Sequence, residues 1–340
     1  MLVVGRSEPC HIRVSSKILS LASEVFKAMF NPRFQEGSML RSAENRTAEP
    51  LIVTLPEDDS AAMLSLCQLL HYQIDMIDPH PDVTALLTLA TVCDKYNCAG
   101  AIRYASHIWL NPLVDSSDIS SLNKLLISSY LFDCAEVFTK VTRKMLEKWT
   151  GSLKELMRDD GGPTFPTSIY GELSYELTAQ DFARLTRLLV TLEGKQNDFH
   201  YHVERSLQEM LAKFLKGDDL RCTIRGLNKF TKKDHIGACV TAFIRIGLWP
   251  ISRTSNISTT LEQLNAFQWT TTDNRCPYVG CAQCELDFKP KVEKIREEAL
   301  RRVEGLCLDC IHYDGHHLGI CPIPHRKENP GSVEAGDLAT

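Results

Sequence analysis

The sequence lacks the features of a membrane-spanning, exported or nucleotide-binding protein. No apolar run approaches the roughly 18 residues that a membrane span requires. Residues 1–5 have neither the basic stretch nor the long apolar core of a signal peptide. There is no Walker loop, no dinucleotide-binding fingerprint and no Gly-x-Ser-x-Gly nucleophile elbow. We therefore expect a cytoplasmic or nuclear protein that is not an enzyme and has no membrane partner and no small-molecule substrate.

The chain also has little excess charge of either sign. Lys and Arg total 38 against 43 Asp and Glu, which gives a net charge of −5. A chain this mildly acidic has no general attraction for phosphate backbones or anionic lipid. Residues 289–302 hold six basic and three acidic side chains, and such mixed signs favour a solvated helix face. Nucleic acid is therefore not an expected partner.

Short β-prone runs at the start of the chain give way to helical apolar periodicities. Leu2–Val4 and residues 11–14 predict a hairpin, and residues 51–55 predict a third strand. Apolar spacing over residues 18–30 predicts a helical pair, which Pro32 stops. Further helices are expected after Asp58 or Asp59, after Pro81, over residues 99–110, within 116–157, from about 178 to 216, and over 238–249. Few strands and many helices indicate the α+β class.

A chain of 340 residues is longer than a typical single domain, so several units are expected. Glycines and prolines at 161–166 indicate a linker, and the polar end of the chain is predicted to be disordered. The predicted units are an α+β domain in 1–110, its helical extension in 111–160, a helical region in 161–270, a cysteine-rich segment in 271–325 and a disordered tail in 326–340.

Three motifs in the first third of the chain resemble those of the BTB/POZ domain. Leu19, Ser23 and Phe26 fit the family's L-x-x-x-S-x-x-F helical hairpin, which follows a strand. The stretch from Val53 through Pro56 and Asp59 to Met63 resembles the third strand and the helix that it feeds. Asp94-Lys95-Tyr96, with Cys98, resembles the family's KY helix end. The match is closest to BTB proteins that are abundant in filamentous fungi and continue into a helical region.

This resemblance implies a three-stranded sheet clasped by helices, acting as a protein-interaction adaptor. It also implies possible recruitment of a cullin-type ubiquitin ligase. A short sheet leaves an edge and an apolar groove for partners. Two departures from the family are visible. Ser15 stands where many members have His, and the chain begins at the first strand, so the N-terminal helix that exchanges across many BTB dimers is not expected.

The second informative region is rich in cysteine. In a reducing compartment, the 13 cysteines are better interpreted as core thiols or metal ligands than as disulfides. Two Cys-x2-Cys pairs fit a structural zinc site. They are separated by a predicted helix with the apolar stripe Val292, Ile295, Ala299 and Val303. The predicted ligands of this zinc-knuckle-like segment are Cys281, Cys284, Cys307 and Cys310.

Alternatives to this ligand set stay open. Cys276 could replace Cys281, and His316, His317 or Cys321 could replace a thiolate or form a second site with Cys276 and His312. The thiols could also carry no metal. If the zinc segment contacted nucleic acid, the protein would instead be a transcription or chromatin regulator.

Other candidate chemistry is less well supported. His200 and His202 are two apart on an expected helix, so they point to different sides and form a poor metal pair. Asp58 and Asp59 are interpreted as a helix cap and not a catalytic dyad. We expect Cys93, Cys98 and Cys134 to lie on apolar helix faces, where thiols are usually inert.

Overall fold

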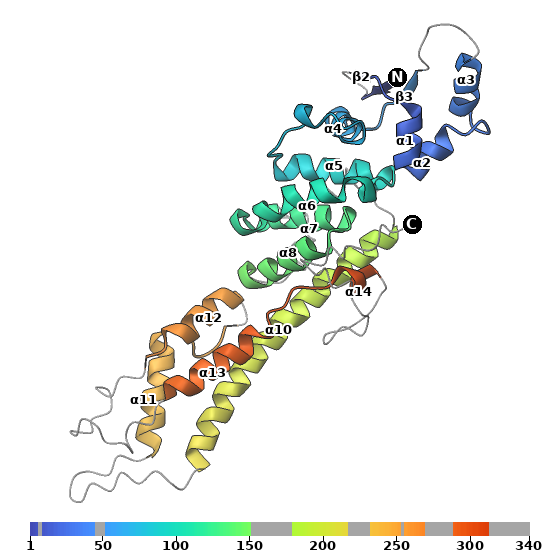
Figure 1. Ribbon diagram of the computed structural model, residues 1–340. Coiled ribbons are helices and arrows are strands. Elements are labelled where there is room, and N and C mark those ends of the chain that lie inside the picture. Colours follow the sequence, from blue (N-terminus) through green and yellow to red (C-terminus); the bar gives the residue numbers. More distant parts are fainter. Residues whose placement is uncertain are drawn as a thin grey trace, which may run out of the picture.

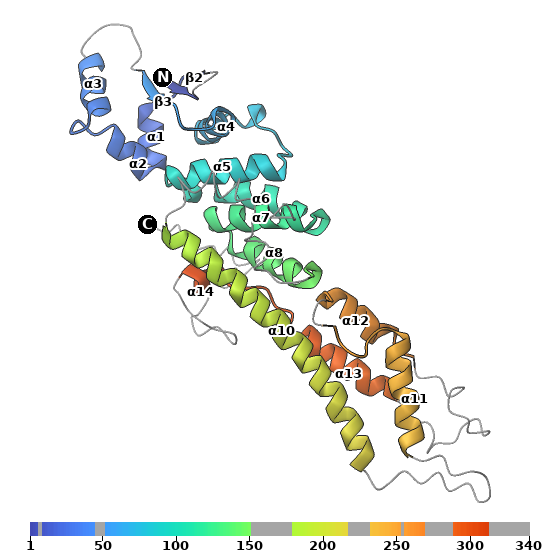
Figure 2. The same cartoon turned by 180° about the vertical axis from the view of Figure 1, so that it is seen from behind.

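A computed structural model describes residues 1–5, 9–44, 52–150, 179–216, 232–252, 255–268 and 288–312. These residues form an elongated molecule (Figures 1 and 2). A small sheet and helices α1–α3 lie at one end, helices α4–α8 are stacked in the middle, and the long helix α10 leads to α11–α13 at the other end. The α+β class is confirmed for the described residues.

The sheet contains three short strands in the order β2-β1-β3. They are β1 (Leu2–Val4), β2 (Cys10–Ile12) and β3 (Val53–Leu55). Strand β1 pairs antiparallel with β2, as in the predicted hairpin, and parallel with β3. Side chains alternate along a strand, so both ends of β1 and of β3 bury their side chains on the helical side.

Side-chain caps begin three helices of the N-terminal region. Ser15 caps α1 (Ser16–Ala22) and Ser23 caps α2 (Glu24–Met29). Asp59, and not Asp58, caps α4 (Ser60–Leu70) by accepting the Ala62 N–H at 2.8 Å. These side chains satisfy backbone donors that have no partner inside the helix.

The next helices are stacked on one another with buried contact faces. They are α5 (Val83–Lys95), α6 (Ala99–Ser116), α7 (Ile119–Leu131) and α8 (Ala135–Lys148). Nine residues of α7 are buried, on every side of the helix. An apolar helix that is buried all round lies inside a core, so α7 is the centre of this stack. The domain boundary predicted at residue 110 falls within α6 and stays a prediction.

Helix α10 (Ala179–Lys216) crosses under α8 and continues to the far end of the molecule (Figure 1). It packs against α11 (Lys232–Arg245), α12 (Ile257–Ala266), α13 (Phe288–Leu300) and α14 (Leu308–His312). The predicted stripe on α13 is confirmed, because Val292, Ile295 and Ala299 are buried.

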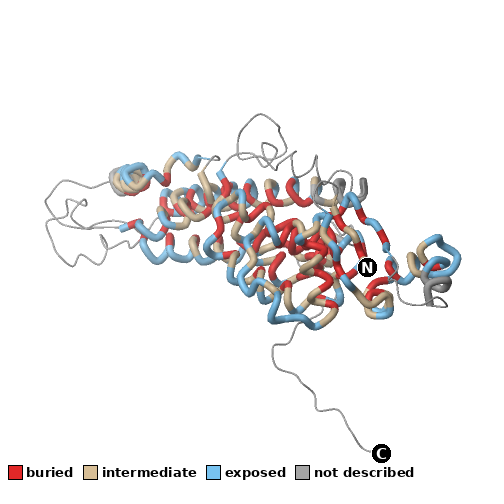
Figure 3. The backbone as a smooth tube through the Cα atoms, turned by 90° about the horizontal axis from the view of Figure 1, so that it is seen from above, coloured by how far each residue is buried: buried red, intermediate tan, exposed pale blue. Residues whose placement is uncertain are grey.

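Buried side chains form one continuous apolar cluster, from Leu2 of the sheet to Leu308 of α14. Figure 3 shows these residues on the inward faces of the helices along the whole molecule. Four of the described elements were absent from the sequence prediction: α3 (Gln35–Glu44), the short 3-10 helix η1 (Ile74–Met76), α12 and α14. The linker at 161–166 and the tail at 326–340 lie outside the described residues. None of the described helices is long and apolar enough to cross a membrane.

Candidate protein-docking surface

A buried polar cluster holds the N-terminal region together. The Asp58 side chain is 2% exposed and accepts from Lys95 Nζ at 2.6 Å and from the Tyr96 hydroxyl at 2.5 Å. The Tyr96 ring stacks on Phe26 with centroids 4.3 Å apart. Ser23 Oγ donates to the Tyr96 carbonyl at 2.5 Å. The motif residues 94–96 therefore tie the end of α5 to α2 and to the turn before α4.

His71 joins the start of α1 to the end of α4. Its Nδ1 lies 2.7 Å from the Cys67 carbonyl and donates to it, since a carbonyl can only accept. Its Nε2 then accepts the Ser15 N–H at 2.9 Å. The chain therefore leaves α4 from a point anchored by side-chain hydrogen bonds.

Immediately after this anchor, three large apolar side chains project into solvent. Tyr72, Ile74 and Met76 are 85%, 68% and 72% exposed. We call this group the ridge. It includes η1 and lies in the connection between α4 and α5 (Figure 1). Exposed apolar groups that gather in one place mark interaction sites more often than single exposed residues do.

Backbone hydrogen bonds hold the ridge in one conformation. The Tyr72 N–H donates to the Leu69 carbonyl at 3.1 Å, and the Met76 N–H donates to the Gln73 carbonyl at 3.1 Å. Tyr72 has a φ of +58°, which only a minority of non-glycine residues adopt. A partner that bound the ridge would therefore not have to order a loose loop first, which favours binding.

The charge beside the ridge is negative. Between Tyr72 and Asp82 there are three aspartates, Asp75, Asp78 and Asp82, and no lysine or arginine. All three are exposed. Described contacts bring cations to the two edges of this segment. Lys124 donates to Thr84 Oγ1 at 2.8 Å, and Ser15, which lies between Arg13 and Lys17, donates its N–H to His71 Nε2 at 2.9 Å. A polar rim around an apolar centre is the common arrangement of interaction surfaces, and here the rim includes aspartates.

A second exposed apolar group lies on α1–α3, and we call it the α1–α3 surface. Leu21 and Phe34 are 82% and 54% exposed, and Val25 and Met39 are also exposed. Leu21 and Val25 belong to the helical apolar periodicity of residues 18–30, which does not show which of its members are exposed. The sequence prediction also did not identify the ridge, although apolar residues alternating at 72, 74 and 76 before two prolines are a visible signal.

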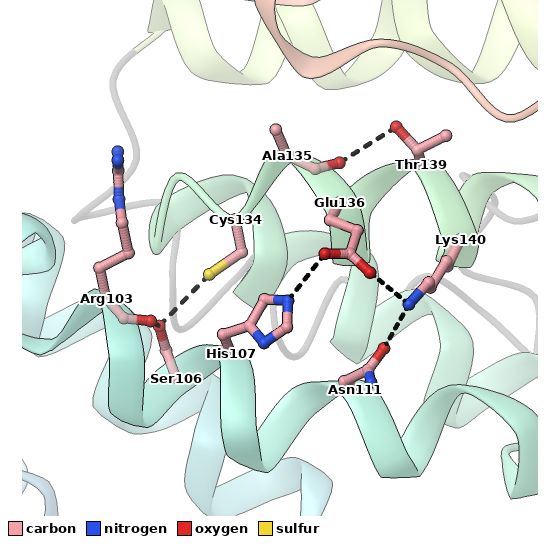
Figure 4. A network of polar contacts seen from close by, with 9 residues as sticks. All are labelled: Arg103, Ser106, His107, Asn111, Cys134, Ala135, Glu136, Thr139 and Lys140. Carbon is pink, nitrogen blue, oxygen red and sulfur yellow. Dashed lines mark hydrogen bonds and ion pairs between the residues drawn. The ribbon is translucent and has the colours of Figure 1, made fainter. Parts of the chain in front are cut away.

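A third exposed face, on α6, is bordered by a polar network that ties α6 to α8. Figure 4 shows Glu136 between His107 and Lys140, with contacts of 3.1 and 2.5 Å. Lys140, and to a lesser degree His107, lower the pKa of Glu136 below its usual range. Beside this network, Tyr104 and Ile108 of α6 are strongly exposed. The network is accessible to water, so it contributes mainly by orienting the two helices.

Of the four predicted zinc ligands, the structure describes two. Cys310 is buried in α14, and Cys307 directly precedes that helix and is partly buried. Cys281 and Cys284 lie outside the described residues, as do Cys276, His316, His317 and Cys321. Within the described ranges, no cluster of three or more His, Cys, Asp or Glu residues could hold a metal. The zinc site therefore stays a prediction.

The segment leading to Cys307 is fastened to α8, and we call it the strap (residues 303–307). The Leu306 N–H donates to Thr142 Oγ1 at 2.8 Å, and Thr139 Oγ1 donates to the Leu306 carbonyl at 3.0 Å. A Cβ on Gly305 would lie 1.9 Å from the Thr139 carbonyl oxygen. Only glycine permits this approach. The Cys-x2-Cys turn therefore begins at a fixed point on α8.

The other cysteines named from the sequence are core thiols. Cys93, Cys98 and Cys134 are all buried. Cys93 lies on a helix face as predicted, whereas Cys98 and Cys134 are instead the N-cap residues of α6 and α8. Burial raises the pKa of Cys98 to about 11 and that of Cys93 well above its ordinary value. Because the thiolate is the reactive form, these thiols are unreactive near neutral pH.

Comparison with known proteins found no relative of this chain. No protein-family model, curated protein or solved structure matches it. The class that the fold and the surface define is therefore an α+β protein with exposed apolar groups on an ordered N-terminal region.

Proposed function

We propose that the protein is a protein-interaction adaptor whose N-terminal region binds other polypeptides through the ridge. The observation that carries the proposal is the exposure of Tyr72, Ile74 and Met76 on a hydrogen-bonded backbone. Aromatic and long apolar side chains contribute most of the binding energy at protein interfaces when a partner buries them. A rigid base reduces the entropy lost on binding.

The resemblance to BTB/POZ proteins supports the same proposal. Leu19 and Phe26 of the hairpin motif are buried, and Tyr96 of the KY motif is buried against Phe26. These motif residues thus share one core, as they would in a member of that family. A member of the family could recruit a cullin-type ubiquitin ligase, and we propose a cullin as the first partner to test.

The first prediction concerns the partner itself. Full-length protein is to be affinity-purified from the cells that make it, alongside Ile74→Glu/Met76→Glu. Both side chains are largely exposed, so the variant should fold while burial of its charges at an interface would cost several kcal/mol. Quantitative mass spectrometry should find a specific partner that the wild type retains and the variant loses.

Ile108→Glu is the matched control, because Ile108 is 68% exposed on α6 and outside the ridge. It should retain the partner. A partner lost equally from both variants, or retained by both, would remove the ridge as the docking site. Specific partners without a cullin would leave an adaptor but remove the ligase assignment.

A zinc ion held by Cys281, Cys284, Cys307 and Cys310 is our second proposal. The supporting observation is the strap, which fixes the turn that carries Cys307 and Cys310. Four thiolates would close the coordination sphere, so the metal would be structural. Elemental analysis after reducing, chelator-free purification should give about one zinc per chain. Cys307→Ser/Cys310→Ser should lose it, whereas a zinc content near zero in the wild type contradicts the proposal.

A further inference from the structure

The ridge and the α1–α3 surface lie at opposite ends of helix α5. The ridge is in the connection that enters α5, whereas Tyr96 at the other end of α5 stacks on Phe26 of α2. Figures 1 and 2 show the α4–α5 connection at one end of α5 and α1–α3 at the other. A helix of 13 residues is about 20 Å long. The two surfaces therefore cannot cover each other within one molecule.

The two surfaces also have opposite charge. Within the ridge and directly after it, residues 72–82 hold three aspartates and no lysine or arginine, as described above. The α1–α3 surface is flanked by exposed cations, and the acidic residues whose side chains are described there, Glu24 and Glu36, do not balance them. Glu24 is paired with Lys27 at 3.1 Å, which leaves the other cations in excess. The exposed cations are Arg13, Lys17, Lys27 and Arg33.

We propose that the ridge of one copy binds the α1–α3 surface of a second copy, head to tail. Both surfaces offer exposed apolar side chains, and their charges are complementary. The contact joins two different patches, so it is heterologous and leaves a free ridge at one end of a dimer and a free α1–α3 surface at the other. Assembly would continue to a ring or a chain.

This inference rests on the same ridge as the proposed function, and it adds a way in which partner binding would be regulated. A ridge covered by a second copy is not available to another protein, so self-association and partner binding compete. The free concentration of the chain would therefore set how much of it can act as an adaptor.

The test is sedimentation equilibrium of full-length variants, alone and mixed. Ile74→Glu/Met76→Glu removes the ridge, and Leu21→Glu/Phe34→Glu removes the α1–α3 surface. We expect the wild-type average mass to rise with concentration and each variant alone to stay a single chain. An equimolar mixture of the two should form a dimer and stop there, because each copy keeps one functional half. Ile108→Glu should behave as wild type.

Charge exchange tests the electrostatic part. Asp75→Lys/Asp78→Lys should weaken self-association about tenfold at low salt, and Lys17→Glu/Arg33→Glu should do the same. Mixing these two variants should restore association, because the reversed ridge then meets the reversed surface. Added salt should weaken the wild-type contact.

Three results would overturn the proposal: a wild-type mass that stays that of one chain, variant mixtures that stay monomeric, or a ridge variant that still self-associates. The last result together with loss of association by Leu21→Glu/Phe34→Glu would mean that the α1–α3 surface binds itself. None of these results depends on the partner screen, so either proposal can fail while the other stands.

Discussion

At the scale of single residues, the cluster around Asp58 shows how burial decides the importance of a charge. Asp58 is almost fully enclosed, whereas 34% of the Lys95 side chain is exposed. Removal of Lys95 and removal of Asp58 should therefore destabilise the fold by different amounts. Lys95 can turn toward water, but Asp58 cannot.

We expect Lys95→Met to lower the free energy of unfolding by about 3 kcal/mol, because it leaves a buried carboxylate with a single neutral donor. Asp58→Asn should cost only about 1 kcal/mol, since an amide keeps the shape and can still bond to Tyr96. Urea unfolding followed by circular dichroism gives both values. Equal losses would show that the carboxylate is better solvated than its burial indicates.

His200 is the residue from which a pH dependence follows. It is 2% exposed on α10, and neither ring nitrogen has a hydrogen-bond partner among the described residues. Burial lowers the pKa of His200 below its ordinary value of 6.5. In the unfolded chain His200 therefore takes up a proton at a higher pH than in the folded chain.

The unfolded state is thus favoured as pH falls below about 6.5, and the loss of stability continues down to the lowered pKa of the folded state. Unfolding measured between pH 7.5 and 5.5 should show this loss, and His200→Leu should reduce it. Burial also lowers the pKa of His202, which is unchanged in that variant. The part of the pH dependence that comes from His202 should therefore remain. A wild type and a His200→Leu variant with parallel pH profiles would contradict the assignment.

At the scale of elements, the strap joins two segments that lie far apart in the sequence. Its hydrogen bonds to Thr139 and Thr142 connect residues more than 160 positions apart. The close approach of Gly305 to α8 makes this contact sensitive to a single methyl group.

Gly305→Ala should therefore lower the free energy of unfolding by about 1–3 kcal/mol, because the new Cβ would overlap the Thr139 carbonyl. Gly194→Ala is the matched control. Gly194 is an exposed residue in the interior of α10 with open space around its Cβ position, so alanine there should stabilise the helix by about 0.5–1 kcal/mol. Thermal unfolding of both variants measures these changes in stability. A Gly305→Ala variant as stable as wild type would show that the strap can move away from α8.

At the scale of the whole molecule, one apolar cluster runs from the sheet to α14. Gln196 of α10 adds a polar link to it, because its Nε2 donates to the Trp149 carbonyl at the end of α8 at 3.0 Å. A shared core couples the unfolding of the parts that contribute to it.

We therefore expect the described helices to unfold in one transition. Leu126→Ala in α7 and Leu207→Ala in α10, both fully buried, should shift the same transition to lower urea, each by a loss of about 2–5 kcal/mol. Helicity and tryptophan fluorescence should report the same midpoint in each variant. Two separated midpoints would instead mean that the stack and the α10–α13 end unfold independently.

The sequence alone determined the type of most elements and the start of several, among them α1, α4, α5 and α6. Caps such as Ser15 and Asp59, and the apolar stripes of α10 and α13, are local signals, because both partners lie within one or two helical turns. Only the tertiary structure decided that Asp58 pairs with Lys95, that the strap lies on α8, and that Leu21 and Ile74 face solvent. Each of these depends on what distant segments cover, and hydrophobic periodicity shows which residues share a face without showing whether another element packs on it.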